Sequence, residues 1–443
     1  MKTFKLGGVH PQQHKLSAGR KAQIVTLPTQ AIISLGHHIG APSLPVVAKG
    51  DFVKVGQLIG EANGFISANI HSSVSGTVFK IDDAIDATGN KRPAIFIDVE
   101  GDEWLESIDR SPEIIRECTL ASDEIIKKIA GAGIVGLGGA TFPTHVKLSP
   151  PPGKKAEVLI INAVECEPYL TCDHQLMLEK GEEILVGITV LMKALNVNRA
   201  VIGIENNKKD AISHLKQLAK SFKGIKIIPL KVHYPQGGEK QLIDATIGRQ
   251  VPSGALPIEV GAVVQNVGTA YAVYEAVQKN KPLFERIITI TGKAMASQGN
   301  FWARLGTPFS NIVAQAGGVP VGTGKIIGGG PMMGRALSTL EVPMAKGSAG
   351  VLFIPTHESA RKAMQNCTRC SKCVSACPMG LEPYLLMNQS ERSMWPGMET
   401  HMVMDCIECG CCAFSCPSNR PLLDYIRIGK TSVGGIIRNR NVK

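Results

Sequence analysis

Most of the cysteine in this chain lies near its C-terminal end. Nine of the twelve cysteines follow residue 366, and eight of these form two runs of C-x-x-C-x-x-C-x-x-x-C, each followed by proline. The runs are Cys367, Cys370, Cys373 and Cys377, and then Cys406, Cys409, Cys412 and Cys416, with a constant offset of 39 residues. Three thiolates with this spacing can hold three corners of a metal–sulfur cubane from one tight loop.

This spacing is the bacterial signature for two [4Fe–4S] clusters, in which each fourth cysteine ligates the other cluster. We therefore assign Cys367, Cys370, Cys373 and Cys416 to one cluster, and Cys406, Cys409, Cys412 and Cys377 to the other. Disulfides would need an oxidising compartment, for which the sequence gives no sign. Zinc sites usually use sets of four ligands, not interlocked sets of three plus one. Cys411 is surplus to both sets and is interpreted as a packing residue.

Composition sets the broad class of the protein. The 443 residues suggest about three domains. The sequence contains neither a long uncharged apolar run nor a signal-peptide pattern, so we expect no membrane span of its own. The net charge of +11 favours acidic partners or nucleotide ligands, whereas the scattered bases and 5% aromatic content argue against nucleic acid. Residues 431–443 form a basic tail, interpreted either as a solvated segment or as a contact for an acidic partner or anionic lipid.

The N-terminal region, residues 1–105, has short apolar runs between turns, which is typical of β structure. Residues 45–60 and 70–78 resemble the flattened barrel-sandwich of biotinyl and lipoyl domains. The hairpin between them, at residues 64–69, has no lysine at its tip. We therefore expect the fold without the swinging-arm chemistry, and a structural or docking role for this domain.

Residues 106–283 alternate between helical and strand patterns, which predicts an α/β sheet. The expected helices cover residues 122–130, 182–195 and 208–221, and the expected strands cover residues 158–161, 200–204 and 225–230. Gly131 to Gly136 matches G-x-G-x-x-G, but a Rossmann loop follows a strand, and the segment before this one is predicted to be helical.

Four segments of this region carry groups suited to binding a flat, anionic ligand. Residues 136–147 combine glycines, an aromatic and a lysine, and glycine lets the main chain approach a ring or a phosphate. Residues 162–167 follow the strand at 158–161, and ligands bind at the carboxyl ends of strands in open α/β sheets. Residues 234–240 and 263–269 add further glycine, amide and carboxylate groups.

Together these segments resemble the flavoprotein that carries the NADH site of respiratory complex I. The resemblance implies a non-covalent FMN site, NAD(H) as the substrate, and a small β-grasp-like module at residues 284–340. The residues that it places at the FMN are Gly136, Gly138, Gly139, Lys147, Asn162, Glu165, Tyr234, Gly237, Gly238, Asn266 and Thr269. It places Phe142 and Glu167 at the nicotinamide nucleotide, with Glu239 near both ligands, and makes Glu167 and Glu239 the candidate catalytic residues.

The order of domains is similar to that of the C subunit in the Rnf family of ion-translocating ferredoxin:NAD oxidoreductases. That order is a barrel-sandwich, an FMN domain, a β-grasp module and an α-helical, ferredoxin-like domain with two clusters at residues 360–430. The resemblance implies a peripheral subunit on the cytoplasmic side of a bacterial inner membrane. Its partners would be the other proteins of the complex, including a ferredoxin-like iron–sulfur subunit.

A nicotinamide transfers two electrons as a hydride, whereas an iron–sulfur cluster carries one electron. A flavin between them would join the two, and we expect the path NADH, FMN, two clusters, partner subunit. Two alternatives stay open at this stage. One is a corrinoid (cobalamin) reductase of a bacterial microcompartment, which would use the same path. The other is an electron relay without a working flavin site, because Leu137 and Val164 stand where the family has arginine and aspartate.

Overall fold

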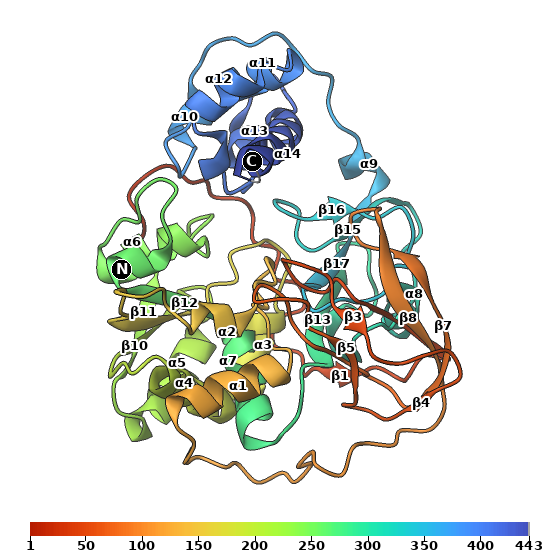
Figure 1. The fold of residues 1–443 in the computed structure, drawn as a ribbon. Helices are drawn as coiled ribbons and strands as arrows, with labels where there is room; N and C mark the ends of the chain where they lie inside the picture. Colours follow the sequence, from red (N-terminus) through yellow and green to blue (C-terminus); the bar gives the residue numbers. More distant parts are fainter. Residues whose placement is uncertain (442–443) are drawn as a thin grey trace.

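A computed structural model describes residues 1–441. Residues 442 and 443, which include Lys443 of the expected basic tail, lie outside the described part. Figure 1 shows three bodies: an α/β body, a β-rich body made of the N-terminal region and residues 285–355, and a helical body at the C-terminal end. The helical body sits over the other two, above the edge of the α/β sheet and the strands β15 and β16.

The N-terminal part of the β-rich body is a flattened barrel of two small sheets. Its four-stranded antiparallel sheet has the order β2-β8-β7-β4, with β2 at Gln30–Ser34, β8 at Lys91–Val99, β7 at Gly76–Ile85 and β4 at Phe52–Val53. Its three-stranded sheet joins β3 (Leu44–Pro45), β5 (Leu58–Glu61) and β6 (Ile70–His71). Alternate residues such as Ile33 and Ile95, which pair across β2 and β8, are fully buried between the sheets. This alternation is what the short apolar runs predict.

The α/β body contains one parallel sheet with the order β11-β10-β9-β12. The strands are β9 (Val158–Asn162), β10 (Ala200–Glu205), β11 (Ile225–Leu230) and β12 (Ala262–Asn266). The helices are α1 (Ser122–Gly131), α2 (Thr144–Lys147), α3 (Cys172–Glu179), α4 (Gly181–Ala194), α5 (Lys209–Leu218), α6 (Glu239–Ile247) and α7 (Val267–Gln278), with short 3-10 turns at Ala219–Ser221 and Pro257–Val260. One apolar core joins α1, α4, α5 and α7 to one face of the sheet, and a second joins α6 to the other face.

The second part of the β-rich body is a six-stranded sheet with the order β1-β14-β13-β17-β15-β16. Its strands are β1 (Gln23–Ile24), β13 (Glu285–Gly292), β14 (Gly299–Arg304), β15 (Thr323–Gly328), β16 (Arg335–Ala336) and β17 (Gly350–Pro355). Helix α8 (Phe309–Gln315) packs on it, and α9 (Thr356–Ser359) leads to the helical body. Strand β1 comes from the N-terminal region and pairs parallel with β14, so the two parts share one sheet.

The helical body is built around two short cysteine loops and one long helix. Its elements are α10 (Lys372–Ser375), α11 (Pro383–Glu391), α12 (Trp395–Thr400), a 3-10 turn at Val403–Asp405, α13 (Cys411–Ser415) and α14 (Leu422–Asn441). Leu386, Met387, Met398 and Leu422 form its apolar centre. Within residues 1–441, no helix is both long enough and apolar enough to cross a membrane.

The helices and strands expected in the α/β region are confirmed. Helix α1 precedes the glycine loop, as the sequence predicted, so this loop does not follow a strand. The strands at 158–161 and 200–204 are present and fully buried, whereas the strand at 225–230, at the edge of the sheet, buries Ile227, Ile228 and Leu230. The C-terminal region is helical, in agreement with the expectation for residues 360–430.

Candidate flavin and iron–sulfur sites

The carboxyl ends of β9 and β12 form the centre of the first candidate site. Asn162 and Asn266 are the last residues of these strands and pair in register. The chain runs from β9 to β10 and β11 on one side and then crosses to β12 on the other, so the strand order reverses between β9 and β12. A crevice outside the strand ends at such a reversal is where open α/β sheets bind ligands.

The glycine loop covers this point. Its base is fixed by two hydrogen bonds, from Gly136 N to Phe142 O at 2.9 Å and from Leu137 N to Thr269 Oγ1 at 2.9 Å. The tip is bare main chain, because Gly138 and Gly139 are exposed and Gly139 has a φ of 121°. A Cβ added to Gly138 would lie 3.4 Å from Asn266 Cβ. The loop tip therefore lies in contact with the strand end, and its exposed main chain fits a flat ligand held by main-chain groups.

A cation lies near the end of β12. Lys147, in α2, donates to Glu239 Oε1 at 2.6 Å and to Val264 O at 3.1 Å. Glu239 is the first residue of α6, where a negative charge is stabilised by the helix dipole. Lys147 and Glu239 keep 29% and 39% of their side-chain surface exposed, so both groups are accessible to a ligand at the strand ends.

Main-chain and side-chain amides lie at the same strand ends. Asn162 Nδ2 donates to Gly237 O at 2.8 Å, which fixes the turn at residues 234–238 beside the end of β9. Gly237 is tightly surrounded, because a Cβ would lie 3.2 Å from Cys166 Sγ. Gly238 precedes α6 as its N-terminal cap residue. Asn266 Oδ1 accepts from Gly268 N at 2.8 Å, and so caps α7.

The acidic loop after β9 faces inward. The Glu165 carboxylate accepts from Asp173 N at 2.7 Å and from His174 N at 3.3 Å, at the N-terminus of α3, and its backbone has a φ of 47°. Asp173 is partly buried and accepts from Asn266 Nδ2 at 2.8 Å. Burial and the nearby Glu165 charge raise the pKa of Asp173 to about 6. Asp173 was not predicted as a site residue, and the sequence of α3, in which polar His174 and Gln175 follow it, gives no local signal for it.

Glu167 is turned toward the six-stranded sheet. Its carboxylate accepts from Met333 N at 2.7 Å and from Met332 N at 3.2 Å. Burial is the main cause that raises the pKa of Glu167 to about 7. The role of Glu167 at a nicotinamide stays a prediction, and its visible partners are the main-chain amides of the loop that follows β15.

Two lysines contact the acidic loop after β9, and neither was predicted from the sequence. Lys208 is fully buried, donates to Val164 O at 2.7 Å and lies 3.9 Å from Glu205 Oε2, and burial lowers its pKa to about 8. Lys15 donates to the carbonyls of Glu165, Glu167 and Leu170 at 2.8, 2.9 and 2.7 Å. No local sequence pattern links Lys15 to a loop about 150 residues away.

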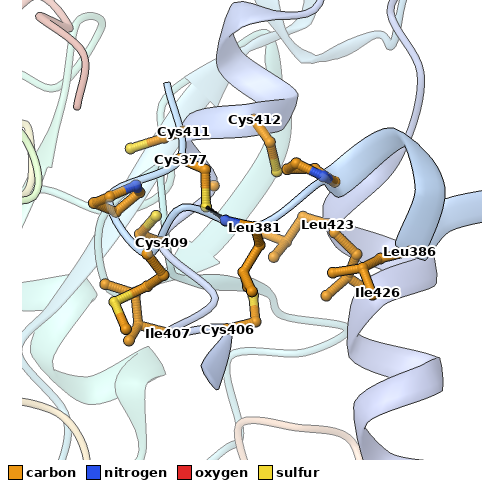
Figure 2. Close-up of a pocket in the computed structure, with 14 residues that line it drawn as sticks. Cys377, Leu381, Leu386, Cys406, Ile407, Cys409, Cys411, Cys412, Leu423 and Ile426 are labelled. Atoms are coloured by element: carbon orange, nitrogen blue, oxygen red, sulfur yellow. Dashed lines mark hydrogen bonds between the residues drawn. The ribbon is translucent and has the colours of Figure 1, made fainter. Parts of the chain in front are cut away.

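The second candidate site is a cavity in the helical body (Figure 2). Cys406, Cys409 and Cys412 of the second run line it together with Cys377, the fourth cysteine of the first run. Cys416, the fourth cysteine of the second run, is not among its lining residues. These four cysteines are the set that crossed ligation assigns to one cluster. The remaining walls are apolar, with Leu381, Leu386, Ile407, Leu423 and Ile426.

The donor set suits a soft metal cluster, because thiolates are the ligands that iron–sulfur clusters use. Within the described residues, no three His, Cys, Asp or Glu side chains already stand at metal-binding distances from one another. The thiols share one cavity, in which Cys377 and Cys412 pack as small apolar groups. Cys411 also lines the cavity, and its thiol lies 3.9 Å from Tyr234 O.

The other four cysteines are more open. Cys367 and Cys370 are exposed, and Cys373 and Cys416 are partly buried against the apolar centre of the helical body. Helix α10, which carries Cys373, packs against α13, which directly precedes Cys416. The structure thus brings Cys373 and Cys416 to one region and leaves Cys367 and Cys370 on a surface loop.

The two candidate sites touch each other. Tyr234 Oη, in the turn beside Asn162, donates to Cys409 O at 2.8 Å, and Tyr234 is 2% exposed. Met332, whose amide binds Glu167, lies so close to the cysteine loop that a Cβ on Gly410 would be 2.8 Å from Met332 O. Arg427 of α14 donates to Met333 O at 3.1 Å. The strand ends, the loop after β15 and the cysteine cavity therefore form one continuous region.

Three family models match separate parts of the chain. The Nuo51 FMN-binding domain matches residues 129–275, the RnfC barrel sandwich hybrid domain matches residues 2–102, and the SLBB domain matches residues 287–336. The first of these contains the glycine loop, the acidic loop and both strand ends described above.

Similar proteins cover nearly the whole chain. The sequence is 44% identical over 97% of its length to the C subunit of the proton-translocating ferredoxin:NAD(+) oxidoreductase complex of Clostridium ljungdahlii, of which it covers 94%. It is 43% identical over 97% of its length to the C subunit of the Na(+)-translocating ferredoxin:NAD(+) oxidoreductase complex of Acetobacterium woodii, of which it covers 97%. Among solved structures, a chain of an NAD+-reducing [NiFe]-hydrogenase shares 18% identity, with a TM-score of 0.49 over 70% of this chain and 60% of that one.

Proposed function

Because this chain belongs to the family of the C subunits of ion-translocating ferredoxin:NAD(+) oxidoreductase complexes, we propose that it exchanges a hydride with NAD(H) at a bound FMN and passes single electrons through two [4Fe–4S] clusters to partner subunits. When bound, FMN supplies the chemistry that joins a two-electron donor to one-electron carriers. The names of the similar proteins favour this function over a corrinoid reductase and over a relay without a flavin.

The crevice at the ends of β9 and β12 is the proposed FMN site. The exposed main chain of Gly138 and Gly139 would lie against the flavin, as their bare loop tip supports. Lys147, held by Glu239, would supply positive charge for the anionic parts of the ligand. Asn162 and Asn266 would supply amide groups at the floor, and Thr269 would hold the loop in place through Leu137 N.

The proposed nucleotide-facing residues are Phe142, Glu167 and Glu239. Phe142 is partly exposed on the glycine loop, which suits a stacking residue. Glu239 is partly exposed beside Lys147. Glu167 would act mainly by holding the loop at Met332 and Met333, because its carboxylate accepts hydrogen bonds from both of their amides.

The cysteine cavity is the proposed site of the cluster nearer to the flavin. Cys377, Cys406, Cys409 and Cys412 would ligate it, and the apolar walls would exclude water. Positive charge lies nearby: Lys430 donates to Cys406 O at 2.5 Å. Cys367, Cys370, Cys373 and Cys416 would hold the second cluster, on the more exposed side of the helical body.

The observation that carries this proposal is the hydrogen bond from Tyr234 Oη to Cys409 O. It joins the turn of the proposed FMN site directly to a loop that carries three of the four proposed cluster ligands. A flavin and a cluster bound at these two places would be neighbours, which electron transfer between them requires.

The test is anaerobic. The purified chain is reconstituted with iron, sulfide and FMN, and NADH is added while flavin absorbance and EPR spectra are recorded. We expect flavin bleaching followed by the signals of two reduced clusters. Reduction of the clusters by dithionite together with no response to NADH would contradict the proposed hydride exchange.

The partners are proposed from the same family membership. The chain would be a peripheral subunit on the cytoplasmic side of a bacterial inner membrane, with ion translocation carried out by membrane-spanning partners and electrons exchanged with a ferredoxin-like iron–sulfur subunit. The test is affinity purification of the chain from detergent-solubilised membranes. Co-purification of membrane proteins of the complex is expected, whereas recovery with microcompartment shell proteins or an adenosyltransferase would contradict the proposal.

A further inference from the structure

Residues 2–17, which we call the strap, cross the molecule in an extended path. The strap begins beside the end of β11, where Lys2 forms a bridge with Leu230. It then passes the helical body, pairs with the turn of the proposed FMN site through Val9 and Tyr234, and ends at the acidic loop after β9. Three parts of the structure that are distant in sequence are therefore in contact with one short segment.

At the acidic loop, the strap provides one ammonium group for three carbonyls. Lys15 Nζ donates to the main-chain oxygens of Glu165, Glu167 and Leu170 at 2.7–2.9 Å. An ammonium carries three N–H donors, so this set uses all of them. The loop needs such support, because Glu165 and Tyr169 adopt positive φ values of 47° and 69°, which residues other than glycine rarely take.

Neighbouring contacts fix the same stretch of the strap. Tyr169 N donates to Gln13 O at 2.8 Å, and the Ser17 and Thr171 hydroxyls are 2.6 Å apart and buried. The His14 ring stacks on Tyr169 with centroids 4.8 Å apart. The strap is thus bound along the whole acidic loop and not at a single point.

At the helical body, the strap makes a contact that only glycine permits. Gly7 has a φ of 67°, and an added Cβ would lie 2.5 Å from the carbonyl carbon and oxygen of Cys377 and 2.8 Å from Pro378 N. The next residue, Gly8, donates its N–H to Ala376 O at 3.0 Å. The main chain of the strap therefore lies directly against the main chain of a proposed cluster ligand.

We propose that the strap is a positioning element that sets the separation between the flavin site and the nearer cluster. Lys15 holds the acidic loop of the flavin site, and Gly7 fixes how closely the Cys377 loop approaches. This inference rests on the proposed function. Flavin reduction by NADH in the unaltered chain tests that function, and only the strap variants below test the inference.

The first experiment replaces Lys15. Lys15→Met removes three charge-assisted hydrogen bonds, so FMN should bind at least about tenfold more weakly. Hydrogen exchange of the peptide covering residues 163–171 should accelerate in the apoprotein. Lys15→Arg should not restore either property, because a planar guanidinium does not match three carbonyls arranged around an ammonium. Lys21→Met is the control, since Lys21 is an exposed lysine of the same region.

The second experiment compares two glycines with similar backbone angles. Gly19 has a φ of 74° and open space around an added Cβ, whereas Gly7 has a φ of 67° and no such space. Alanine therefore strains the backbone equally at both positions, but only Gly7→Ala pushes the Cys377 loop away. In stopped-flow experiments with NADH, Gly7→Ala should slow cluster reduction about tenfold while the rate of flavin reduction stays unchanged.

The iron content of Gly7→Ala and Gly19→Ala is measured as well. Loss of iron from Gly7→Ala alone also supports the inference, because the displaced residue is a proposed ligand. Equal behaviour of Gly7→Ala and Gly19→Ala, in rate and in iron content, would overturn the role of Gly7. Unchanged FMN affinity and unchanged hydrogen exchange in Lys15→Met would overturn the role of Lys15.

Discussion

The Tyr234 hydroxyl offers a direct test of how the helical body is held against the α/β sheet. In Tyr234→Phe, the Cys409 carbonyl loses a donor at 2.8 Å, while the aromatic ring keeps its buried place. A buried carbonyl without a donor costs ~1–3 kcal/mol, which corresponds to a factor of roughly 5 to 150 in a local opening equilibrium.

The helical body should nevertheless stay docked. Gly8 N still donates to Ala376 O, Gln241 Nε2 to Pro378 O and Arg427 to Met333 O. We therefore expect normal iron and flavin content together with faster local opening. The equilibrium shift should appear at the contact itself and leave the distant barrel unaffected.

The assay is hydrogen exchange of the apoprotein under conditions where the exchange rate reports the opening equilibrium. The amide of Gly8, which donates to Ala376 O across this interface, should exchange about 5 to 150 times faster in the variant. Tyr274→Phe is the matched control, since Tyr274 is also a buried residue but its hydroxyl makes only a 3.4 Å contact with Ile115 N. Equal exchange at Gly8 in both variants would refute the reasoning that Tyr234 holds this interface.

Three further predictions concern charge, ligation and the nucleotide. Burial lowers the pKa of Lys346 to about 7 from 10.5, so the unfolded chain binds more protons than the folded chain between these values. Stability should therefore rise with pH from about 7 to 10.5, by up to roughly 5 kcal/mol, and urea unfolding of Lys346→Met should show a flatter pH dependence. In a Cys373→Ala background that keeps one cluster, Cys377→Ala should abolish the remaining EPR signal and Cys416→Ala should retain it, whereas the reverse result would contradict crossed ligation. Glu167→Gln should slow flavin reduction by NADH with FMN and iron content intact, because a Gln side chain has one acceptor oxygen for two main-chain N–H groups, and unchanged NADH kinetics would count against this role.

Features that depend on the spacing of residues along the chain could be predicted from the sequence. The two cysteine runs predict cluster ligands because one tight loop brings three thiolates together whatever surrounds it. The apolar runs at residues 158–161 and 200–204 predict buried parallel strands, since a strand covered on both faces has few polar positions. The position of Asn162 after the first of these runs placed it at the ligand-binding edge of the sheet.

Other features required the tertiary structure. The direction of Glu167 depends on a loop 165 residues away, and no pattern of residue types pairs that carboxylate with Met332 and Met333. The same holds for Lys15, whose partners lie about 150 residues further along the chain. Every residue has a main-chain carbonyl, so the partners of such a lysine cannot be predicted from the types of the residues.

The cysteines show which features the sequence predicts and which features the tertiary structure decides. Residue spacing indicated which side chains are suited to hold clusters. It also predicted that the fourth cysteine of each run ligates the cluster of the other run. The packing of the helical body decided that Cys377 lines the same cavity as Cys406, Cys409 and Cys412, and that this cavity lies beside Tyr234. Spacing along the chain constrains only atoms within a few residues, whereas the separation of two sites is set by contacts between segments that the backbone does not connect directly.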